Sequence, residues 1–118
     1  MDFKIIFYKS TEGSSPIEEF LDDLERVNSL LYAQTLKGLE KLKNRAYHKE
    51  PLSMYLELGL WELRIRSENN ILRVIYTFTK GQIIILLHGF IKKQQKTPTS
   101  ELEEARKRLK DLKIRKII

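Results

Sequence analysis

The sequence has 118 residues, a formal net charge of +6 and an ordinary hydrophobic content of 42%. This length predicts one domain covering residues 1–118. The absence of cysteine excludes disulfides, zinc–thiolate sites and a thiol nucleophile. Residues 1–10 lack the apolar run of a signal peptide, and no segment has the unbroken apolar length of a membrane span. We therefore expect a cytoplasmic protein with no membrane partner.

The positive charge is concentrated near the end of the chain. Residues 88–118 contain ten Lys and Arg against four Asp and Glu, a balance of +6 that equals that of the whole chain. A local cationic field attracts polyanions, so nucleic acid is the favoured partner class. Charge alone equally allows a solvated basic helix without a special role.

The first predicted elements are a strand and a helix. Residues 3–8 are rich in β-branched and aromatic side chains, which is typical of a short strand. A helix start follows, because Ser15 can cap it, Pro16 suits its first position and Glu18 completes a capping box. This helix runs to about residue 26.

A second helix is predicted from Asn28 or Ser29 to about residue 44. Its apolar stripe is expected to contain Ala33, Leu36, Leu39 and Leu42. Because the connection is so short, the two helices should pack as a hairpin. A loop follows over residues 45–53.

A pattern with a period of two begins near Tyr55 and predicts three strands. They cover residues 58–66, 71–78 and 83–91. Short polar or glycine-containing connections separate them, so we expect an antiparallel three-stranded meander. Thr97 and Pro98 then open a last helix with apolar residues Leu102, Ala105, Leu109 and Leu112. The predicted fold class is α+β, in the order β, α, α, β, β, β, α.

Strand alternation predicts which residues share a face. In the first meander strand, Glu62, Arg64 and Arg66 should point away from the core. In the third, the shared face should hold Ile84, Leu86, His88, Phe90 and Lys92. Arg73 stands in an apolar run, where a charge needs a partner or an open surface. We expect one concave surface to be bordered by Arg64, Arg66, Arg73, His88 and Lys92.

Several segments together resemble a known family. They are Leu-Trp-Glu-Leu-Arg at 60–64, Leu-Arg-Val-Ile-Tyr at 72–76, Leu-His-Gly-Phe-Ile-Lys-Lys at 87–93, and Lys-Thr-Pro at 96–98 followed by Glu101 and Ala105. The chain thereby resembles the phage-derived HigB-like branch of the RelE/ParE toxin superfamily. The resemblance implies a RelE-like domain and a toxin encoded beside a HigA-like antitoxin with a helix-turn-helix domain. It also implies an RNase that cuts mRNA in the ribosomal A site.

Metal-free RNA cleavage makes three chemical demands. The 2′-OH must lose a proton, the charge on the phosphate must be stabilised, and the leaving oxygen must gain a proton. A guanidinium grips two phosphate oxygens at once, so Arg73 is expected to be the principal clamp, with Arg64 and Arg66 beside it. Candidates for proton transfer are His88, Lys92, Lys93, Lys96 and Tyr76, since crowding by cations lowers a lysine pKa. Candidates for RNA binding are Arg66, Lys96, Arg106, Lys107 and Lys110.

Each candidate also has a purely structural interpretation. Arg64 and Arg66 can pair with Glu62 and Glu68 on a solvated strand face. Arg73 can be an ion-pair partner, His88 a hydrogen-bonded residue at a strand end, and Tyr76 a core residue. His48, in a loop, is expected to be merely exposed.

The sequence predicts neither a metal site nor a small-molecule cofactor, because acids do not cluster and the glycines lack nucleotide-binding spacing. Two other functions stay open: a ParE-like inhibitor of DNA gyrase, and a non-catalytic basic RNA-binding adaptor. We expect the antitoxin to contact one of the first two helices or the last helix.

Overall fold

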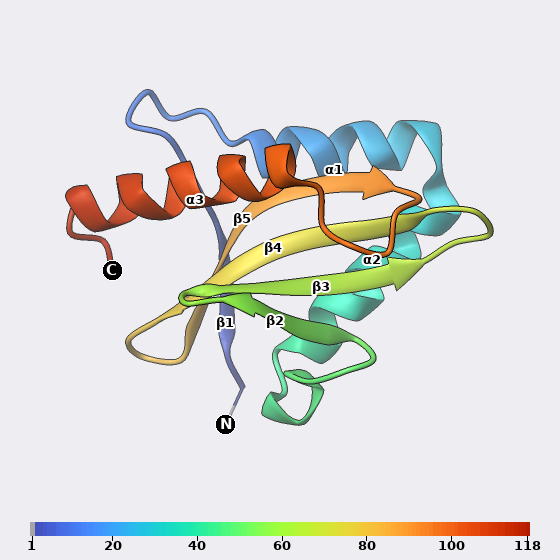
Figure 1. Cartoon of the computed structure of the whole chain (residues 1–118), viewed down its shortest axis with the longest axis horizontal. Helices are drawn as coiled ribbons and strands as arrows, with labels where there is room; N and C mark the ends of the chain where they lie inside the picture. Colours follow the sequence, from blue (N-terminus) through green and yellow to red (C-terminus); the bar gives the residue numbers. More distant parts are fainter. Residues whose placement is uncertain (1) are drawn as a thin grey trace.

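The computed structural model describes residues 2–118 and confirms the α+β class (Figure 1). In chain order its elements are β1 (Lys4–Phe7), α1 (Pro16–Val27), α2 (Ser29–Leu42), the 3-10 helix η1 (Arg45–Tyr47), β2 (Ser53–Glu57), β3 (Leu60–Arg66), β4 (Ile71–Thr79), β5 (Ile83–Lys92) and α3 (Thr99–Ile114). The strands form one mixed sheet in the order β1-β5-β4-β3-β2. β1 runs parallel to β5, and the other neighbours are antiparallel.

The meander has four strands, so the prediction of three is too short. β2 lies outside every predicted strand and pairs with β3 from Ser53 opposite Leu63 onward. A register irregularity between Tyr55 and Glu57 interrupts this pairing, and the connecting turn places Gly59 at a φ of +85°. These features put an irregular strand and a tight turn where the sequence pattern shows only the start of a longer strand.

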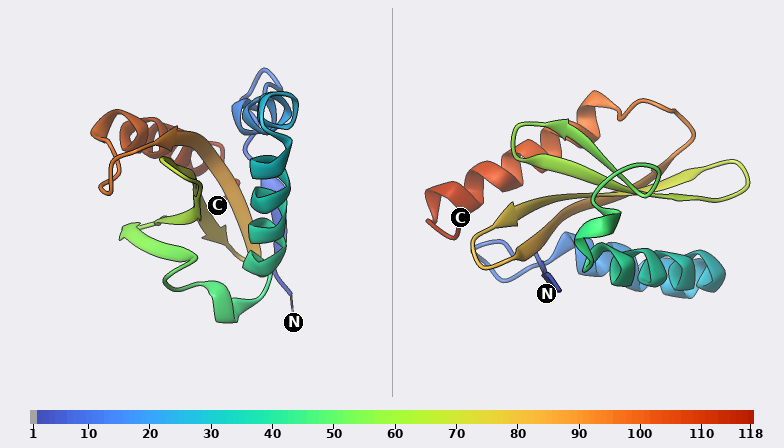
Figure 2. Two further views of the ribbon diagram at one scale, coloured as in Figure 1. Left: turned by 90° about the vertical axis from the view of Figure 1, so that its right-hand side faces the viewer. Right: turned by 90° about the horizontal axis from the view of Figure 1, so that it is seen from below.

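The sheet lies between two helical layers. α1 and α2 cover one face and α3 covers the other, as the left view of Figure 2 shows. The larger apolar cluster joins the α1–α2 layer to side chains such as Leu63, Val74 and Leu86. The smaller cluster joins α3 to Ile75 and Leu87. Each helix buries one stripe, which is the usual way in which an amphipathic helix packs on a sheet.

The start of α1 agrees with the capping prediction. The hydroxyl of Ser15 accepts a hydrogen bond from the backbone nitrogen of Glu18 at 3.4 Å, and Pro16 is the first helical residue. The predicted stripe of α2 is wrong. Its buried residues are Leu31, Thr35, Gly38, Leu39 and Leu42, while Ala33 is exposed and Leu36 is 43% exposed. Spacing by three drifts around a helix of 3.6 residues per turn, so Ala33 and Leu42 point in opposite directions.

An extra residue in β5 changes which side chains share a face. Ile75 pairs with His88, but the next residue, Tyr76, pairs with Leu86, which leaves Leu87 as a bulge. Leu86 therefore faces the α1–α2 layer, whereas His88 contacts α3. The prediction that one face holds Ile84, Leu86, His88, Phe90 and Lys92 is therefore wrong. Ile84 and Leu86 face the α1–α2 layer, whereas His88, Phe90 and Lys92 lie on the α3 face. The bulge places His88 on the same face as Arg73.

Candidate functional site

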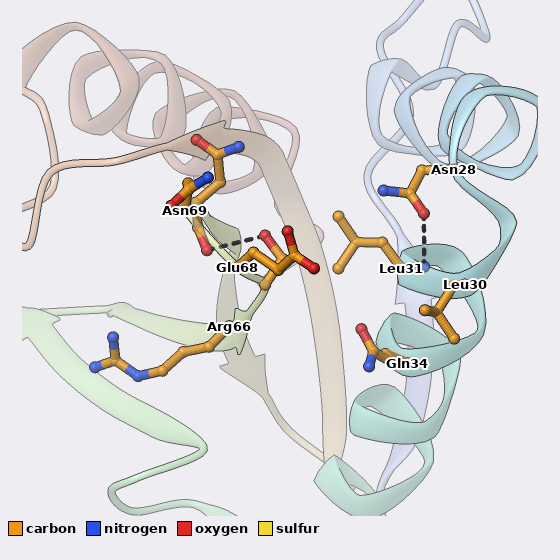
Figure 3. A pocket seen from close by; sticks show the side chains of 9 residues that line it. Asn28, Leu30, Leu31, Gln34, Arg66, Glu68 and Asn69 are labelled. Carbon is orange, nitrogen blue, oxygen red and sulfur yellow. Dashed lines mark hydrogen bonds between the residues drawn. The ribbon is translucent and has the colours of Figure 1, made fainter.

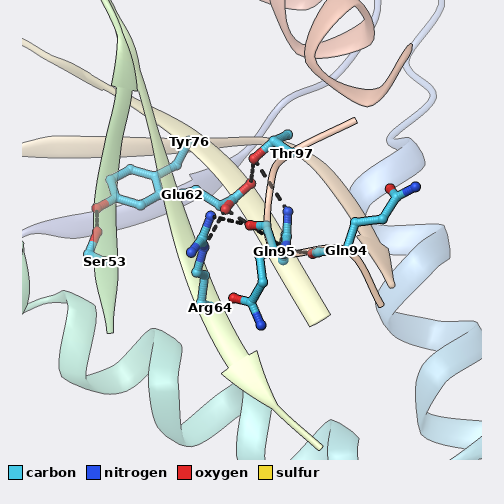
Figure 4. A network of polar contacts seen from close by, with 8 residues as sticks. Ser53, Glu62, Arg64, Tyr76, Gln94, Gln95 and Thr97 are labelled. Carbon is cyan, nitrogen blue, oxygen red and sulfur yellow. Dashed lines mark hydrogen bonds and ion pairs between the residues drawn. The ribbon is translucent and has the colours of Figure 1, made fainter. Parts of the chain in front are cut away.

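Three of the predicted site residues, Arg64, Arg73 and Lys96, lie where the chain passes from β5 to α3. The connecting segment, residues 93–98, crosses the α3 face of β3 and β4 and contacts side chains from both strands (Figures 1 and 4). α3 begins at Thr99, one residue after Pro98, and no side chain caps its first turn. The hydroxyl of Thr97 instead donates to Glu62 Oε2 at 2.8 Å, which ties this segment to β3.

Arg73, the predicted phosphate clamp, is fully buried beneath this segment. Its Nη2 donates to the backbone oxygens of Gln94 and Gln95, at 3.0 Å for the latter, and its Nη1 donates to Thr97 Oγ1 at 3.5 Å. Figure 4 labels Gln94, Gln95 and Thr97, the three residues that accept these hydrogen bonds. Burial lowers the pKa of Arg73. The donors that would grip a phosphate are therefore already bound to the protein's own carbonyl and hydroxyl oxygens.

Glu62 supplies the negative charge of this buried network. It is fully buried, and its Oε1 accepts a hydrogen bond from Arg64 Nε at 2.7 Å and lies 3.9 Å from Arg73 Nε. The predicted pairing of Arg64 with Glu62 is confirmed, but its carboxylate is fully buried rather than on a solvated face. Arg73 Nε is a buried nitrogen without a hydrogen-bond partner among residues 2–118. The network therefore holds two cations around one carboxylate.

His88 has the structural role that the sequence analysis left open. Its Nε2 lies 2.7 Å from Glu101 Oε1, and its Nδ1 lies 3.0 Å from Arg108 Nη1. Both ring nitrogens are thus engaged by α3. Lys92 Nζ lies 3.6 Å from the other oxygen of Glu101 and keeps nearly half of its side chain exposed. In this arrangement His88 anchors α3 to β5 and has no free nitrogen for a substrate.

Tyr76 and His48 are likewise structural. Tyr76 is fully buried, its hydroxyl hydrogen-bonds Ser53 Oγ, and burial raises its pKa to about 12. His48 is half-buried rather than exposed, because its Nε2 lies 2.7 Å from the carbonyl oxygen of Leu42 and its ring packs 4.8 Å from that of Phe3. Tyr76 is thus enclosed in the core, and His48 packs beside the end of α2, away from Arg64 and Lys96.

An open groove adjoins the buried network. We call it the Arg64–Lys96 groove, a cavity of about 500 Å³ lined by Met54, Tyr55, Leu56, Arg64, Gln95, Lys96, Thr97 and Leu102. Lys96 is exposed, and Tyr55 is 57% exposed. Arg64 and Lys96 suit the phosphates of a nucleic acid, whereas the ring of Tyr55 packs on Trp61, on the opposite face of the β2–β3 pair from Arg64. Among the predicted residues, the structure brings Arg64 and Lys96 together at this open surface.

The predicted RNA-binding residues of α3 lie apart from this groove. Arg106 is held by Glu57 through contacts of 2.7 and 2.9 Å, and this hydrogen bonding lowers the pKa of Glu57. Lys107 and Lys110 are exposed on α3 and do not line the groove. Lys93 is exposed on the connecting segment. The basic C-terminal region thus presents its charge on separate surfaces rather than on one.

A second cavity, of about 570 Å³, lies between the start of α2 and the β3–β4 turn (Figure 3). Asn28 borders it and caps α2, since its Oδ1 accepts a hydrogen bond from the backbone nitrogen of Leu31 at 3.1 Å. Figure 3 shows that the guanidinium of Arg66 points away from α2. The walls carry acidic Glu68 and no lysine, so charge does not favour an anionic ligand here.

Residues 19–110 match the family described as "Phage derived protein Gp49-like (DUF891)". The chain belongs to this family. Gp49-like proteins are toxin-like and are related to RelE- and HigB-type toxins. The matched range includes the buried Glu62–Arg73 network and both residues that name the groove. Comparison with curated proteins gave no match.

Several residues that line the groove of this Gp49-like protein, Tyr55 among them, were not predicted as site residues. Tyr55 belongs to β2, and without that strand it has no predicted neighbours. Its ring lies 5.4 Å from that of Trp61 across the β2–β3 pair. The short run before Leu58 and Gly59 is a signal that could have predicted this hairpin. Among residues 2–118, no group of three or more His, Asp or Glu could hold a metal ion, and no helix has the length and apolarity to cross a membrane.

Proposed function

We propose that this Gp49-like protein is the toxin of a type II toxin–antitoxin system and a ribosome-dependent endonuclease that cuts mRNA without a metal and thereby inhibits translation. It acts as one RelE/HigB-like domain in the cytoplasm and is silenced by a HigA-like helix-turn-helix antitoxin. The observation that carries the proposal is the Arg64–Lys96 groove, where two cations line one cavity in a member of a toxin-like family.

The proposed reaction uses the RNA as its own nucleophile. The 2′-OH loses a proton and attacks the adjacent phosphorus, the bond to the 5′-oxygen breaks, and that oxygen gains a proton. The products are a 2′,3′-cyclic phosphate and a free 5′-OH. Arg64 and Lys96 stabilise the charge that builds on the phosphate. Lys92, Lys93 and Lys96 are the candidates for proton transfer, since each keeps an exposed side chain on or beside the connecting segment.

Arg73 joins this reaction only if the connecting segment moves. Its donors are bound to Gln94, Gln95 and Thr97, and a phosphate would have to replace these oxygens. Docking on the ribosome supplies binding energy that can drive such a movement, which gives ribosome dependence a physical basis. In the proposal, Arg64 binds RNA first and Arg73 follows.

The proposal is tested by expressing the wild-type chain and Lys96→Glu in a bacterial host while transcript 5′ ends and growth are followed. Lys96 is exposed and has no ion pair or side-chain hydrogen bond among residues 2–118, so reversing its charge should leave the fold intact. We expect new cleavages within translated messages for the wild type and at least a tenfold loss for Lys96→Glu, because one phosphate contact becomes repulsive.

Lys80→Glu is the matched control. Lys80 is exposed in the β4–β5 turn, at the opposite end of β4 from Arg73, and the same charge change there should preserve cleavage. Growth arrest with intact transcripts would contradict the proposal and favour a ParE-like action on gyrase. Equal losses in the two variants would show that net charge, rather than the groove, controls activity.

A further inference from the structure

We propose that a separate cavity at the edge of β3 is a second binding site for single-stranded RNA. We call it the Lys41–Arg66 cavity; it measures about 390 Å³ and is lined by Lys41, Ala46, Tyr47, Lys49, Glu50, Pro51, Leu52, Arg64 and Arg66. The inference rests on the proposed function for the identity of its ligand. It assigns a binding role to η1 and the following loop, a segment in which the sequence analysis named no site residue.

The charges of the cavity favour an anion. Its lining holds four cations, Lys41, Lys49, Arg64 and Arg66, against one acid, Glu50. Lys49 and Arg66 are exposed and have no ion pair among residues 2–118. Their charges therefore face solvent instead of a carboxylate, and an approaching phosphate would meet them directly.

The aromatic wall favours a nucleotide over a simple anion. Tyr47 is 40% exposed, and Lys41 Nζ lies 5.7 Å from the centre of its ring. Pro51 and Leu52 add apolar surface beside it. A base can stack on such a ring while neighbouring cations hold its phosphates. Duplex bases are already stacked on one another, so the cavity suits an unpaired strand.

Arg64 joins this cavity to the Arg64–Lys96 groove, since it lines both. Arg66 also lines the Lys41–Arg66 cavity, and its guanidinium points away from the start of α2 (Figure 3). A strand whose phosphate meets Arg64 can therefore extend toward Lys96 in one direction and place a base on Tyr47 in the other. The second site would hold RNA on the far side of the phosphate bound at Arg64.

The test measures the affinity of the purified full chain for a fluorescent single-stranded oligouridine as salt is varied. Lys49→Gln removes one phosphate contact, so the slope of log affinity against log salt should become shallower by about 0.7. Tyr47→Leu removes a stacked base, so affinity should fall roughly 5- to 150-fold without a change in slope. Lys80→Gln should change neither quantity.

Three outcomes overturn the inference: no binding of the oligouridine, variants at Lys49 and Tyr47 that match the wild type, or equal affinity for a polyglutamate peptide that Tyr47→Leu leaves unchanged. The last outcome would indicate an acidic protein segment as the ligand. Transcript mapping in cells distinguishes the failure of this site from failure of the proposed function. If Lys96→Glu alone loses oligouridine binding while the wild-type chain still cuts transcripts, the second site is refuted and the proposed endonuclease stands.

Discussion

Glu62 and Arg73 are both fully buried, with Glu62 Oε1 3.9 Å from Arg73 Nε. Because burial removes both groups from water, each charge depends on the other and on nearby polar atoms. Glu62 also accepts hydrogen bonds from Arg64 and Thr97, so one carboxylate connects two strands with the segment that leads into α3. The pair thereby fixes the position of the connecting segment over the sheet.

We predict that Glu62→Gln destabilises the protein by about 3–5 kcal/mol, the usual effect of leaving a buried charge without its partner. Urea unfolding followed by circular dichroism measures this change. Glu68→Gln is the control, because Glu68 is exposed in the β3–β4 turn and has no ion pair among residues 2–118. The double variant Glu62→Leu with Arg73→Met should be more stable than Glu62→Gln, since it removes both charges. A loss below about 1 kcal/mol for Glu62→Gln would contradict the role assigned to the pair.

The burial of Arg73 shows where sequence reasoning reaches its limit. Its apolar neighbours correctly indicated that the charge needs a partner or an open surface. The choice between these two depends on Gln94 and Gln95, about twenty residues further along the chain, whose backbone oxygens leave no pattern in the sequence. The capping signal at Ser15, in contrast, is local, and it correctly predicts the start of α1.

For the strands, too, features set by local sequence were predicted correctly, and features set by distant residues were missed. The hairpins of β3, β4 and β5 have short connections and are close to their predicted bounds. β2 is hidden by an irregular register, and the bulge at Leu87 reverses which later residues of β5 face α3. A bulge depends on the partner strand, so alternation within one strand cannot reveal it. The Arg64–Lys96 groove depends on the missed strand β2 and on the path of residues 93–98.

We predict that His88 carries its proton on Nε2. A guanidinium can only donate hydrogen bonds, so the contact with Arg108 requires Nδ1 to be the acceptor, and Nε2 then donates to Glu101. Nitrogen-15 NMR of the imidazole ring at neutral pH distinguishes the two tautomers. Arg108→Gln is the informative variant, because its amide can still donate to Nδ1 and should preserve the tautomer. Detection of the Nδ1–H form in the wild type would contradict this geometry.

Asp111 should make stability depend on acidic pH. Hydrogen bonds from Arg115 and Tyr8, the latter 2.6 Å long, lower its pKa below the ordinary value of 3.8. The unfolded chain therefore takes up this proton more readily than the folded protein. The stabilisation is complete above about pH 3.8 and is lost as the pH falls through the lower folded pKa.

Melting temperatures measured on both sides of that pH check the prediction. Asp111→Asn should lower the melting temperature near neutral pH and give a smaller further decline in acid than the wild type shows. Asp22→Asn is the control, because Asp22 is exposed on α1 and has no ion pair among residues 2–118. An unchanged acid dependence in Asp111→Asn would show that other carboxylates, such as Glu57, account for the decline.

Two glycines should respond differently to the same substitution. At Gly89 an added Cβ would lie 2.6 Å from Phe20 Cδ2 and 2.9 Å from Ile17 Cδ1, so Gly89→Ala would force α1 away from β5. We expect a loss of about 1–3 kcal/mol, typical of overpacking a core. At Gly38 the nearest atom, also at 2.6 Å, is the end of the flexible Ile65 side chain. Gly38→Ala should be nearly neutral, because the gain in helix propensity, about 1 kcal/mol, offsets this clash. Urea unfolding of both variants tests the contrast, and equal losses would show that α1 yields as easily as Ile65.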